Sequence, residues 1–233
     1  AEYRAAALGT YAAARRALDA ALADQSWSAV DGQTNAGSLP PAVILDLDET
    51  ALDNSVFEAR SIRKGKTFDQ EVWNQWVRES AAGAVPGAAE FLTYAASKGV
   101  TPFYITNRDF DPEGPGTQAN VVKLGFPMST TDDTLLLRGE RPEWKSDKTS
   151  RREYVAQRYR VLLLLGDDLN DFANARELNV ADRDKLIERT TPWWGTRWFM
   201  IPNPIYGSWE RAVAASGTDC EKLQKKIDAL RVQ

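Results

Sequence analysis

The residues that could do chemistry in this chain are carboxylates that follow two short apolar runs. They are Asp46 and Asp48 after the first run, and Asp167, Asp168 and Asp171 after the last. Runs of this kind are typical of strands buried on both faces of a parallel sheet, and ligands of open α/β sheets bind beyond the carboxyl ends of the strands. Carboxylates from two loops would repel each other there, and an oxygen-bound Mg²⁺ offsets this repulsion. The pattern therefore predicts a metal site.

The chain of 233 residues contains no histidine, and this absence excludes several classes of hydrolase. Imidazole is the usual general base near neutral pH and a common metal ligand. Enzymes with Ser-His-Asp or Cys-His sites, histidine-phosphate phosphatases and histidine-based zinc hydrolases are therefore excluded. Cys220 is the only cysteine, which rules out an intrachain disulfide or a CxxC site. What remains is carboxylate chemistry, with a hard cation held by oxygen ligands.

Composition and charge are those of a globular protein, and polymeric nucleic acid is not expected as its partner. Hydrophobic residues make up 43% of the chain and charged residues 27%. No apolar run approaches the roughly 18–20 residues that cross a bilayer, so no transmembrane segment is expected. The net charge of -4 leaves no cationic surplus for neutralising phosphates. The first residues, AEYRAAALG, lack the basic and apolar regions of a targeting peptide. We therefore expect that any such peptide has been removed or never existed.

Apolar runs that predict strands alternate along the chain with stretches that predict helices. The predicted strands are 42–48, 100–108, 134–138 and 160–168. The predicted helices are 2–24, 86–98, 146–159 with Ser146 as its cap, and 219–231. The stretch 111–117 is rich in glycine and proline and predicts a loop. This alternation implies right-handed crossovers and an α/β fold with a doubly wound parallel sheet.

Four motifs carry a resemblance to a known family. They are DLDET (46–50), TNR (106–108), SDKTSRR (146–152) and GDDLND (166–171). With these motifs in this order, the chain resembles the haloacid dehalogenase superfamily of phosphohydrolases. More narrowly, it resembles the bacterial class C acid phosphatases, the lipoprotein-e-like group, from about residue 42 to 211. The resemblance implies a haloacid dehalogenase-like core, formed by residues 1–53 and 99–233, and a small helical cap inserted at 54–98.

The resemblance also implies a reaction and the residues that perform it. The activity would be Mg²⁺-dependent hydrolysis of phosphomonoesters, with Asp46 as the nucleophile that forms an aspartyl-phosphate. Asp46, the backbone carbonyl of Asp48, and Asp167 would bind the Mg²⁺. Asp48 would protonate the leaving alkoxide and then accept a proton from water, so activity shifted to acid pH is expected. Thr106 and Lys148 would hold the oxygens of the transferred phosphoryl group.

Two further aspartates and a second lysine lie near these motifs. Asp171 is expected to orient Lys148 or a metal-bound water. Lys145 is an alternative to Lys148 as the phosphate-binding lysine, and we favour Lys148 because it lies within SDKTSRR. Asp168 stands where the family usually has Asn or Thr. This extra carboxylate beside Asp167 is expected to alter metal affinity or the protonation of its neighbours.

The substrate prediction depends on aromatic and polar residues beside the motifs. By the resemblance, Trp73 and Tyr206 would sandwich the base of a nucleoside 5′-monophosphate, because flat aromatic faces accept bases with little discrimination. Asn54, Asn107 and Arg108 would contact phosphate or ribose, although a turn-forming role is an equal alternative for the two asparagines.

Other functions and the cellular location stay open at this point. A phosphotransferase would use the same aspartyl-phosphate and pass it to an alcohol. A storage or binding protein is also conceivable, because plant vegetative storage proteins resemble this group, but the presence of Asp46 and Asp48 argues against it. The resemblance places the protein in the periplasm, at the outer membrane or outside the cell. The oligomeric state is left open, with a homodimer as one option.

Overall fold

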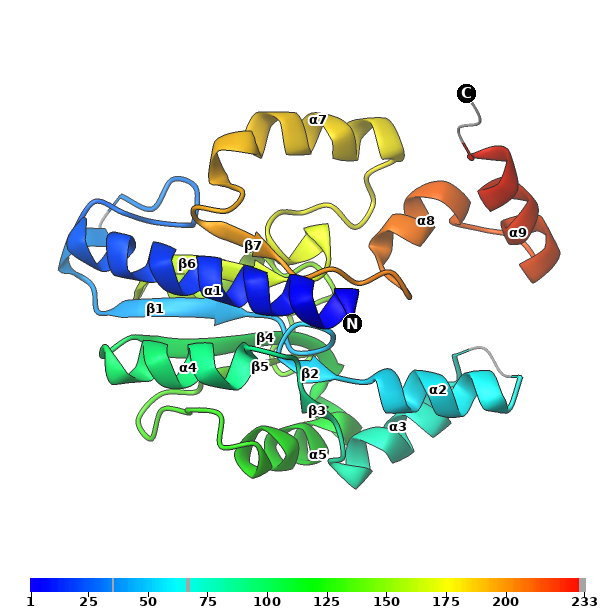
Figure 1. Cartoon of the computed structure of the whole chain (residues 1–233), viewed down its shortest axis with the longest axis horizontal. Coiled ribbons are helices and arrows are strands. Elements are labelled where there is room, and N and C mark those ends of the chain that lie inside the picture. Colours follow the sequence, from blue (N-terminus) through cyan, green and yellow to red (C-terminus); the bar gives the residue numbers. More distant parts are fainter. Residues whose placement is uncertain (35, 66–67, 231–233) are drawn as a thin grey trace.

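In the described part of the chain, residues 1–34, 36–65 and 68–230 of a computed structural model, five parallel strands form one sheet (Figure 1). The strands are β1 (Pro41–Leu45), β4 (Thr101–Asp109), β5 (Leu135–Arg138), β6 (Arg160–Gly166) and β7 (Trp198–Met200). Their order is β5-β4-β1-β6-β7, so the chain runs outward from β1 to one edge and then returns to the other side of β1. The predicted doubly wound parallel sheet is confirmed. Its topological switch point lies at the carboxyl end of β1, where ligands of such sheets bind.

Successive side chains along a strand point to opposite faces of the sheet and pack into two separate hydrophobic cores. In β1, Val43 and Leu45 face a core that includes α1 (Glu2–Ala23) and α4 (Ala88–Ser97), whereas Ala42 and Ile44 face the opposite core. This alternation is the period of two that an extended strand imposes. Two further helices complete the layers, α5 (Phe110–Lys123) against β4 and β5, and α6 (Thr149–Ala156) against β4 and β6. The strand ends that carry the predicted site are therefore held rigidly from both faces.

A helical segment projects beyond the carboxyl ends of the strands. Two short strands, β2 (Leu52–Asp53) and β3 (Gly83–Ala84), pair antiparallel at its base. Between them lie α2 (Ser55–Arg63) and α3 (Gln70–Glu79), which extend away from the sheet (Figure 1). The predicted cap, 54–98, also contains α4, but α4 packs against α1 and β4 in the core layer. We propose a narrower cap, 54–84, on the basis of these contacts.

The C-terminal third of the chain adds further helices. It contains α7 (Val180–Thr190), α8 (Ser208–Ala214) and α9 (Asp219–Asp228). In Figure 1, α8 and α9 lie beyond the strand ends on the side opposite α2 and α3. None of the described helices has the length and apolar character that a bilayer crossing needs.

Several local predictions were wrong. The stretch 111–117 is part of α5, because only Asp111 departs from helical geometry and Pro112 then occupies the first turn, where a missing N–H costs little. Ser146 is not the cap of α6, which begins at Thr149 and whose first N–H is bound by the Asp147 carboxylate at 2.9 Å. The run that forms β7 is only three residues long and was not predicted as a strand. The helix predicted over 219–231 ends at Asp228, and position 231 lies outside the described residues.

The contact between the cap and the core generates a stability prediction. A Cβ atom on Gly116 of α5 would lie 2.4 Å from the backbone oxygen of Val77 in α3, whereas one on Gly9 of α1 would meet nothing within 4 Å. Gly116→Ala should therefore destabilise the fold by about 1–3 kcal/mol, because the helices must separate. Gly9→Ala, the matched control, should be neutral or stabilising by up to about 1 kcal/mol. Urea unfolding measures both, and equal free energies of unfolding would contradict the predicted close approach.

Candidate active site

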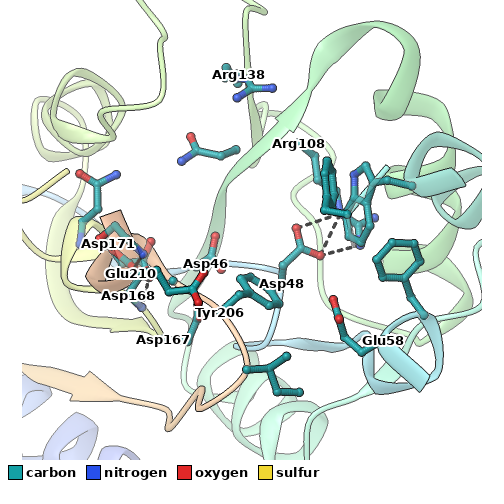
Figure 2. Close-up of a pocket in the computed structure, with 18 of the residues that line it drawn as sticks. Asp46, Asp48, Glu58, Arg108, Arg138, Asp167, Asp168, Asp171, Tyr206 and Glu210 are labelled. Atoms are coloured by element: carbon teal, nitrogen blue, oxygen red, sulfur yellow. Dashed lines mark hydrogen bonds and ion pairs between the residues drawn. The ribbon is translucent and has the colours of Figure 1, made fainter. Parts of the chain in front are cut away.

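A cavity of about 650 Å³ lies beyond the carboxyl ends of the strands, between the cap and the segment 205–210 (Figure 2). Most of the predicted site residues line it: Asp46, Asp48, Trp73, Asn107, Arg108, Lys148, Asp167, Asp168, Asp171 and Tyr206. Asn54 and Thr106 are fully buried. The topology thus brings side chains from distant parts of the chain to one place, as the motif order predicted.

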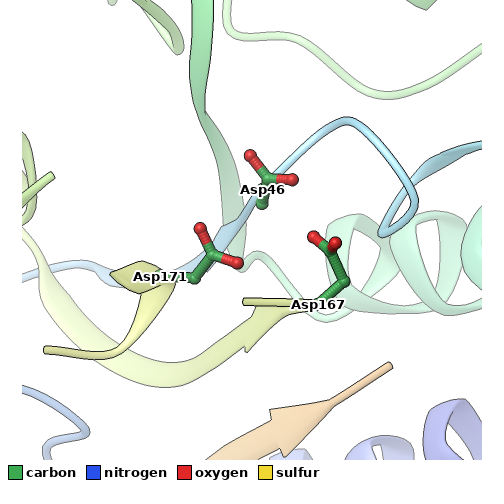
Figure 3. Close-up of side chains that lie close together, drawn as sticks. All are labelled: Asp46, Asp167 and Asp171. Carbon is green, nitrogen blue, oxygen red and sulfur yellow. The ribbon is translucent and has the colours of Figure 1, made fainter. Parts of the chain in front are cut away.

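Three carboxylates converge at the floor of this cavity. Asp46 follows β1, and Asp167 and Asp171 follow β6; one oxygen of each lies within 4.8 Å of the others. Figure 3 shows the three side chains pointing toward a common space. Burial, with the neighbouring carboxylates, raises the pKa of Asp46 to about 7, against the lowering effect of Lys148. Burial, together with the charges of Asp46 and Asp171, raises the pKa of Asp167 well above its ordinary value. The cluster therefore carries strong mutual repulsion.

A buried ammonium group partly offsets this repulsion. Lys148 Nζ donates hydrogen bonds to Asp46 Oδ1 and, at 2.7 Å, to Asp171 Oδ1, and only 5% of the Lys148 side chain is exposed. Lys145 is exposed on the surface, so the geometry favours Lys148 among the two predicted alternatives. The contact to Asp171 agrees with the predicted orienting role of that residue.

The backbone after β6 is shaped so that Asp171 can reach the cluster. Its Oδ2 accepts a hydrogen bond from Asp168 N at 2.9 Å, which closes the short helical turn Leu169–Asp171. A Cβ atom on Gly166 would lie 2.3 Å from Asp171 Cβ. Only glycine fits at position 166, because the aspartate folds back over it.

The donor set fits a small hard cation. Carboxylate oxygens are the ligands that Mg²⁺ prefers, and a divalent cation would remove the repulsion among Asp46, Asp167 and Asp171. The predicted ligand set was Asp46, Asp48 and Asp167. In the structure the third converging side chain is Asp171, whereas the Asp48 carboxylate turns away toward Arg108. The predicted contact through the Asp48 backbone carbonyl stays a prediction.

Asp48 forms an ion pair with the guanidinium group of Arg108. Arg108 Nη2 donates to Asp48 Oδ1 at 2.7 Å, and Arg108 Nε lies 3.1 Å from both carboxylate oxygens. Asn54 Nδ2 donates to the same Oδ1 at 2.8 Å, and Asn54 is held in turn by Trp76 Nε1 at 2.8 Å. The guanidinium carbon of Arg108 lies 5.2 Å from the centroid of the Trp73 ring. Arg108 and Asn54 thus position Asp48, and the contact with phosphate or ribose predicted for both stays a prediction.

The polar residues near the carboxyl end of β4 form hydrogen bonds with backbone groups and with Arg151. Thr106 Oγ1 accepts from Arg108 N at 3.1 Å. Asn107 donates to Ser146 O at 3.0 Å and accepts from Arg151 Nη2 at 2.7 Å. The amide of Asn107 therefore joins β4 to the loop before α6. The turn-forming alternative for this residue was wrong, because Asn107 lies within the strand, and its predicted contact with substrate stays a prediction.

Three residues of the site were missed by sequence reasoning: Glu49 and Arg151 lie in quoted motifs, and Asn203 lies in the stretch PNPIYGSWE (202–210), which is outside the four motifs. Glu49 of DLDET has a left-handed backbone with φ 57°, and its buried carboxylate accepts from Tyr206 Oη at 3.4 Å. Burial and the Asp48 charge raise the pKa of Glu49 to about 7. Arg151 of SDKTSRR is fully buried and donates to the Thr106 carbonyl. Asn203 of PNPIYGSWE donates to Asp167 Oδ2 at 2.8 Å.

Aromatic rings line the cap side of the cavity. Trp73 packs edge-on against Phe57 with 5.1 Å between ring centroids, and Phe68 lies 6.3 Å from Trp73. Tyr206 enters from the opposite side, on the segment after β7. The cavity therefore combines a charged floor with aromatic side chains on its walls, as ligand sites commonly combine a few polar groups with apolar surface.

Comparisons with known proteins agree with this geometry. The sequence model of the HAD superfamily, subfamily IIIB (acid phosphatase), matches residues 7–209. The structure of the class C acid phosphatase from Bacillus anthracis superposes with a TM-score of 0.86 and 34% identity, and the match covers 100% of this chain and 92% of that one. The same enzyme with tungstate bound gives a TM-score of 0.85 and 33% identity over the same shares of both chains.

Curated relatives from a plant match more weakly. The stem 28 kDa glycoprotein of Glycine max is 23% identical over 168 residues, and a stem 31 kDa glycoprotein from the same species is 26% identical over 167 residues. Each match covers 70% of this chain but only 58% of the relative.

The charge balance of the floor generates a stability prediction. Lys148→Met should cost about 3–5 kcal/mol at pH 7 in the presence of EDTA, because it leaves buried carboxylates without their ammonium group. Lys145→Met, the matched surface control, should stay within about 0.5 kcal/mol. An acid whose pKa is raised in the folded state costs stability that builds up as the pH rises from 3.8, its ordinary pKa, to about 7. Lys148 lowers the pKa of Asp46, so its removal extends this loss to higher pH, and the deficit of Lys148→Met should shrink as the pH falls below 7. Urea unfolding at several pH values measures the free energy of unfolding of each variant. Equal free energies for Lys148→Met and Lys145→Met would contradict the prediction.

Proposed function

Since the chain belongs to the acid phosphatases of HAD subfamily IIIB, we propose that it hydrolyses small phosphomonoesters through an aspartyl-phosphate on Asp46, with Mg²⁺ as its cofactor. The chain has the class C acid phosphatase fold and is a phosphomonoesterase. The observation that carries the mechanistic proposal is the position of Asp46, at the carboxyl end of β1 and on the cavity floor beside Lys148. The presence of this aspartate in the cavity argues against a storage role as the main function.

In the proposed mechanism, a carboxylate oxygen of Asp46 attacks phosphorus and forms a P–O bond, while the ester P–O bond breaks. Asp48 protonates the departing alkoxide; in the second step it accepts a proton from the water that hydrolyses the aspartyl-phosphate. The positions of Asp46 and Asp48 on one turn, both lining the cavity, support this division of roles. Lys148 and Thr106 would stabilise the charge on the transferred oxygens. A phosphotransferase would share the first step and differ only in the acceptor.

The metal proposal is supported by the converging carboxylates. Asp46 and Asp167, with Asp171 beside them, would hold the Mg²⁺, which when bound neutralises negative charge and polarises the phosphoryl group. Tungstate is an oxyanion like phosphate, and its binding by the Bacillus anthracis enzyme supports an oxyanion site in this fold.

The substrate proposal is a nucleoside 5′-monophosphate, with its base between Trp73 and Tyr206. Both rings line the cavity, and they reach it from opposite sides, one from the cap and one from the segment after β7. Phosphate would sit on the charged floor while the base meets aromatic walls.

We also propose that the enzyme works outside the cytoplasm, in the periplasm, at the outer membrane or beyond the cell. This location is what the resemblance of the sequence motifs to the class C acid phosphatases implies. The precursor sequence tests it, because a precursor without an export signal would contradict the proposal.

Replacing the nucleophile tests the mechanism. Asp46→Asn should lower kcat by about three orders of magnitude or more while the fold stays intact, because the chain has no histidine that could replace it. Asp184→Asn, at an exposed position of α7, is the matched control and should keep full activity. Phosphate release and circular dichroism measure rate and fold. Activity of Asp46→Asn within tenfold of the wild type would overturn the assignment.

Removal of the metal tests the cofactor. Exhaustive chelation should abolish phosphate release, and added Mg²⁺ should restore it. Mg²⁺ should also raise the Tm of the wild type, and it should do so less for Asp167→Asn, because one ligand is weakened. Full activity after chelation would contradict the proposal.

Removing the ring of Trp73 or Tyr206 tests the proposed nucleotide substrate. Stacking of a base contributes about 1–3 kcal/mol, so Trp73→Ala or Tyr206→Ala should raise KM for a nucleoside monophosphate roughly five- to 150-fold. The KM for p-nitrophenyl phosphate should rise less, and kcat should change little, because stacking is remote from phosphorus. Equal losses for both substrates would mean that the two rings only hold the cap in place.

A further inference from the structure

The segment 203–208, which carries Tyr206, is attached to the catalytic edge at both of its ends by two consecutive aspartates. At the first end, Asn203 Nδ2 donates to Asp167 Oδ2 at 2.8 Å. At the other end, Ser208 Oγ donates to Asp168 Oδ1 at 2.6 Å, and Ser208 N donates to Asp168 Oδ2 at 2.5 Å. Tyr206 thus lies between two anchors that both begin at the loop after β6.

The contacts of Asp168 differ from those of the neighbouring aspartates. Its Oδ1 also accepts from Asn170 N at 2.9 Å, and its own N–H donates to Asp171 Oδ2 at 2.9 Å. Within the described residues, the groups that donate to this carboxylate belong to its own turn and to Ser208. Charged acceptors form hydrogen bonds about twice as strong as neutral ones, so a carboxylate suits this position as a clamp.

Close packing and a nearby cation accompany the clamp. A Cβ atom on Gly207 would lie 3.1 Å from Asp168 Oδ2 and 2.6 Å from Cδ1 of the Trp209 ring. Glycine is therefore required at 207 for the backbone to reach Asp168. Arg183 of α7 donates to Ser208 Oγ at 2.9 Å, which orients the hydroxyl hydrogen toward the carboxylate.

We propose that Asp168 is a positioning residue, which holds segment 203–208 and thereby Tyr206 against the cavity. The sequence suggested an effect of this extra carboxylate on the metal or on the protonation of its neighbours, but its contacts point to the substrate-facing segment. The consequence for substrate binding rests on the proposed role of Tyr206. The attachment itself does not depend on that role.

Hydrogen exchange tests the attachment directly. In Asp168→Ala, amide exchange in a peptide spanning 203–208 should accelerate about tenfold or more, because Ser208 N loses its acceptor. Ser208→Ala removes only the hydroxyl and should give a smaller acceleration, which keeps the test valid if Asp168→Ala folds poorly. Thr218→Ala is the matched control: it removes the capping box of α9 and should leave 203–208 unchanged. Unchanged exchange in both Asp168→Ala and Ser208→Ala would overturn the proposal.

A double-mutant cycle tests whether Asp168 acts through Tyr206. Asp168→Ala should raise KM for a nucleoside monophosphate about fivefold or more with little change in kcat, and it should add nothing further in a Tyr206→Ala background. Additive effects would overturn the proposed route, and so would faster exchange with an unchanged KM in the Asp168→Ala single variant. If Tyr206→Ala alone leaves KM unchanged, the proposed nucleotide site fails, and exchange alone then decides whether Asp168 is the anchor.

Discussion

Repulsion among buried carboxylates is the constraint on which the rest of this structure depends. The doubly wound topology places the ends of β1 and β6 side by side, so Asp46 meets Asp167 and Asp171 in a site with little solvent. An isolated buried charge would be too costly to keep, and Lys148 supplies the opposite charge from another part of the chain. Other local features, such as the glycine at 166, make room for this arrangement.

The two aspartates of DLDET are separated electrostatically although they are two residues apart. Asp46 faces Lys148 on the cavity floor, whereas Asp48 faces Arg108 at the side of the cap. Asp48 lies in a tight turn that starts directly after Asp46: Ala51 and Leu52 both donate their N–H to the Leu47 carbonyl, and Glu49 takes a left-handed backbone, which costs about 1–3 kcal/mol. This separation gives two similar carboxylates different surroundings, the condition for different roles in one reaction.

The walls of the cavity come from other parts of the molecule than its floor. The cap contacts the core through α3 and α5, and segment 203–208 is attached by side-chain hydrogen bonds to the loop after β6. The segments that would meet the organic group are therefore different from those that carry the charged side chains of the floor.

The sequence by itself determined the strands β1, β4, β5 and β6, their alternation with helices and the motif residues of the site, because apolar periodicity and short motifs are local properties. From these, the parallel sheet and the meeting of the carboxylates at one edge followed. Only the tertiary structure decided which partner each charge takes. Asp48 pairs with Arg108 across 60 positions, Lys148 with Asp46 across 102, and Asp168 with Ser208 across 40. Such pairs, like the packing of α4 on α1, depend on the distances between segments in the folded chain, which local spacing does not encode.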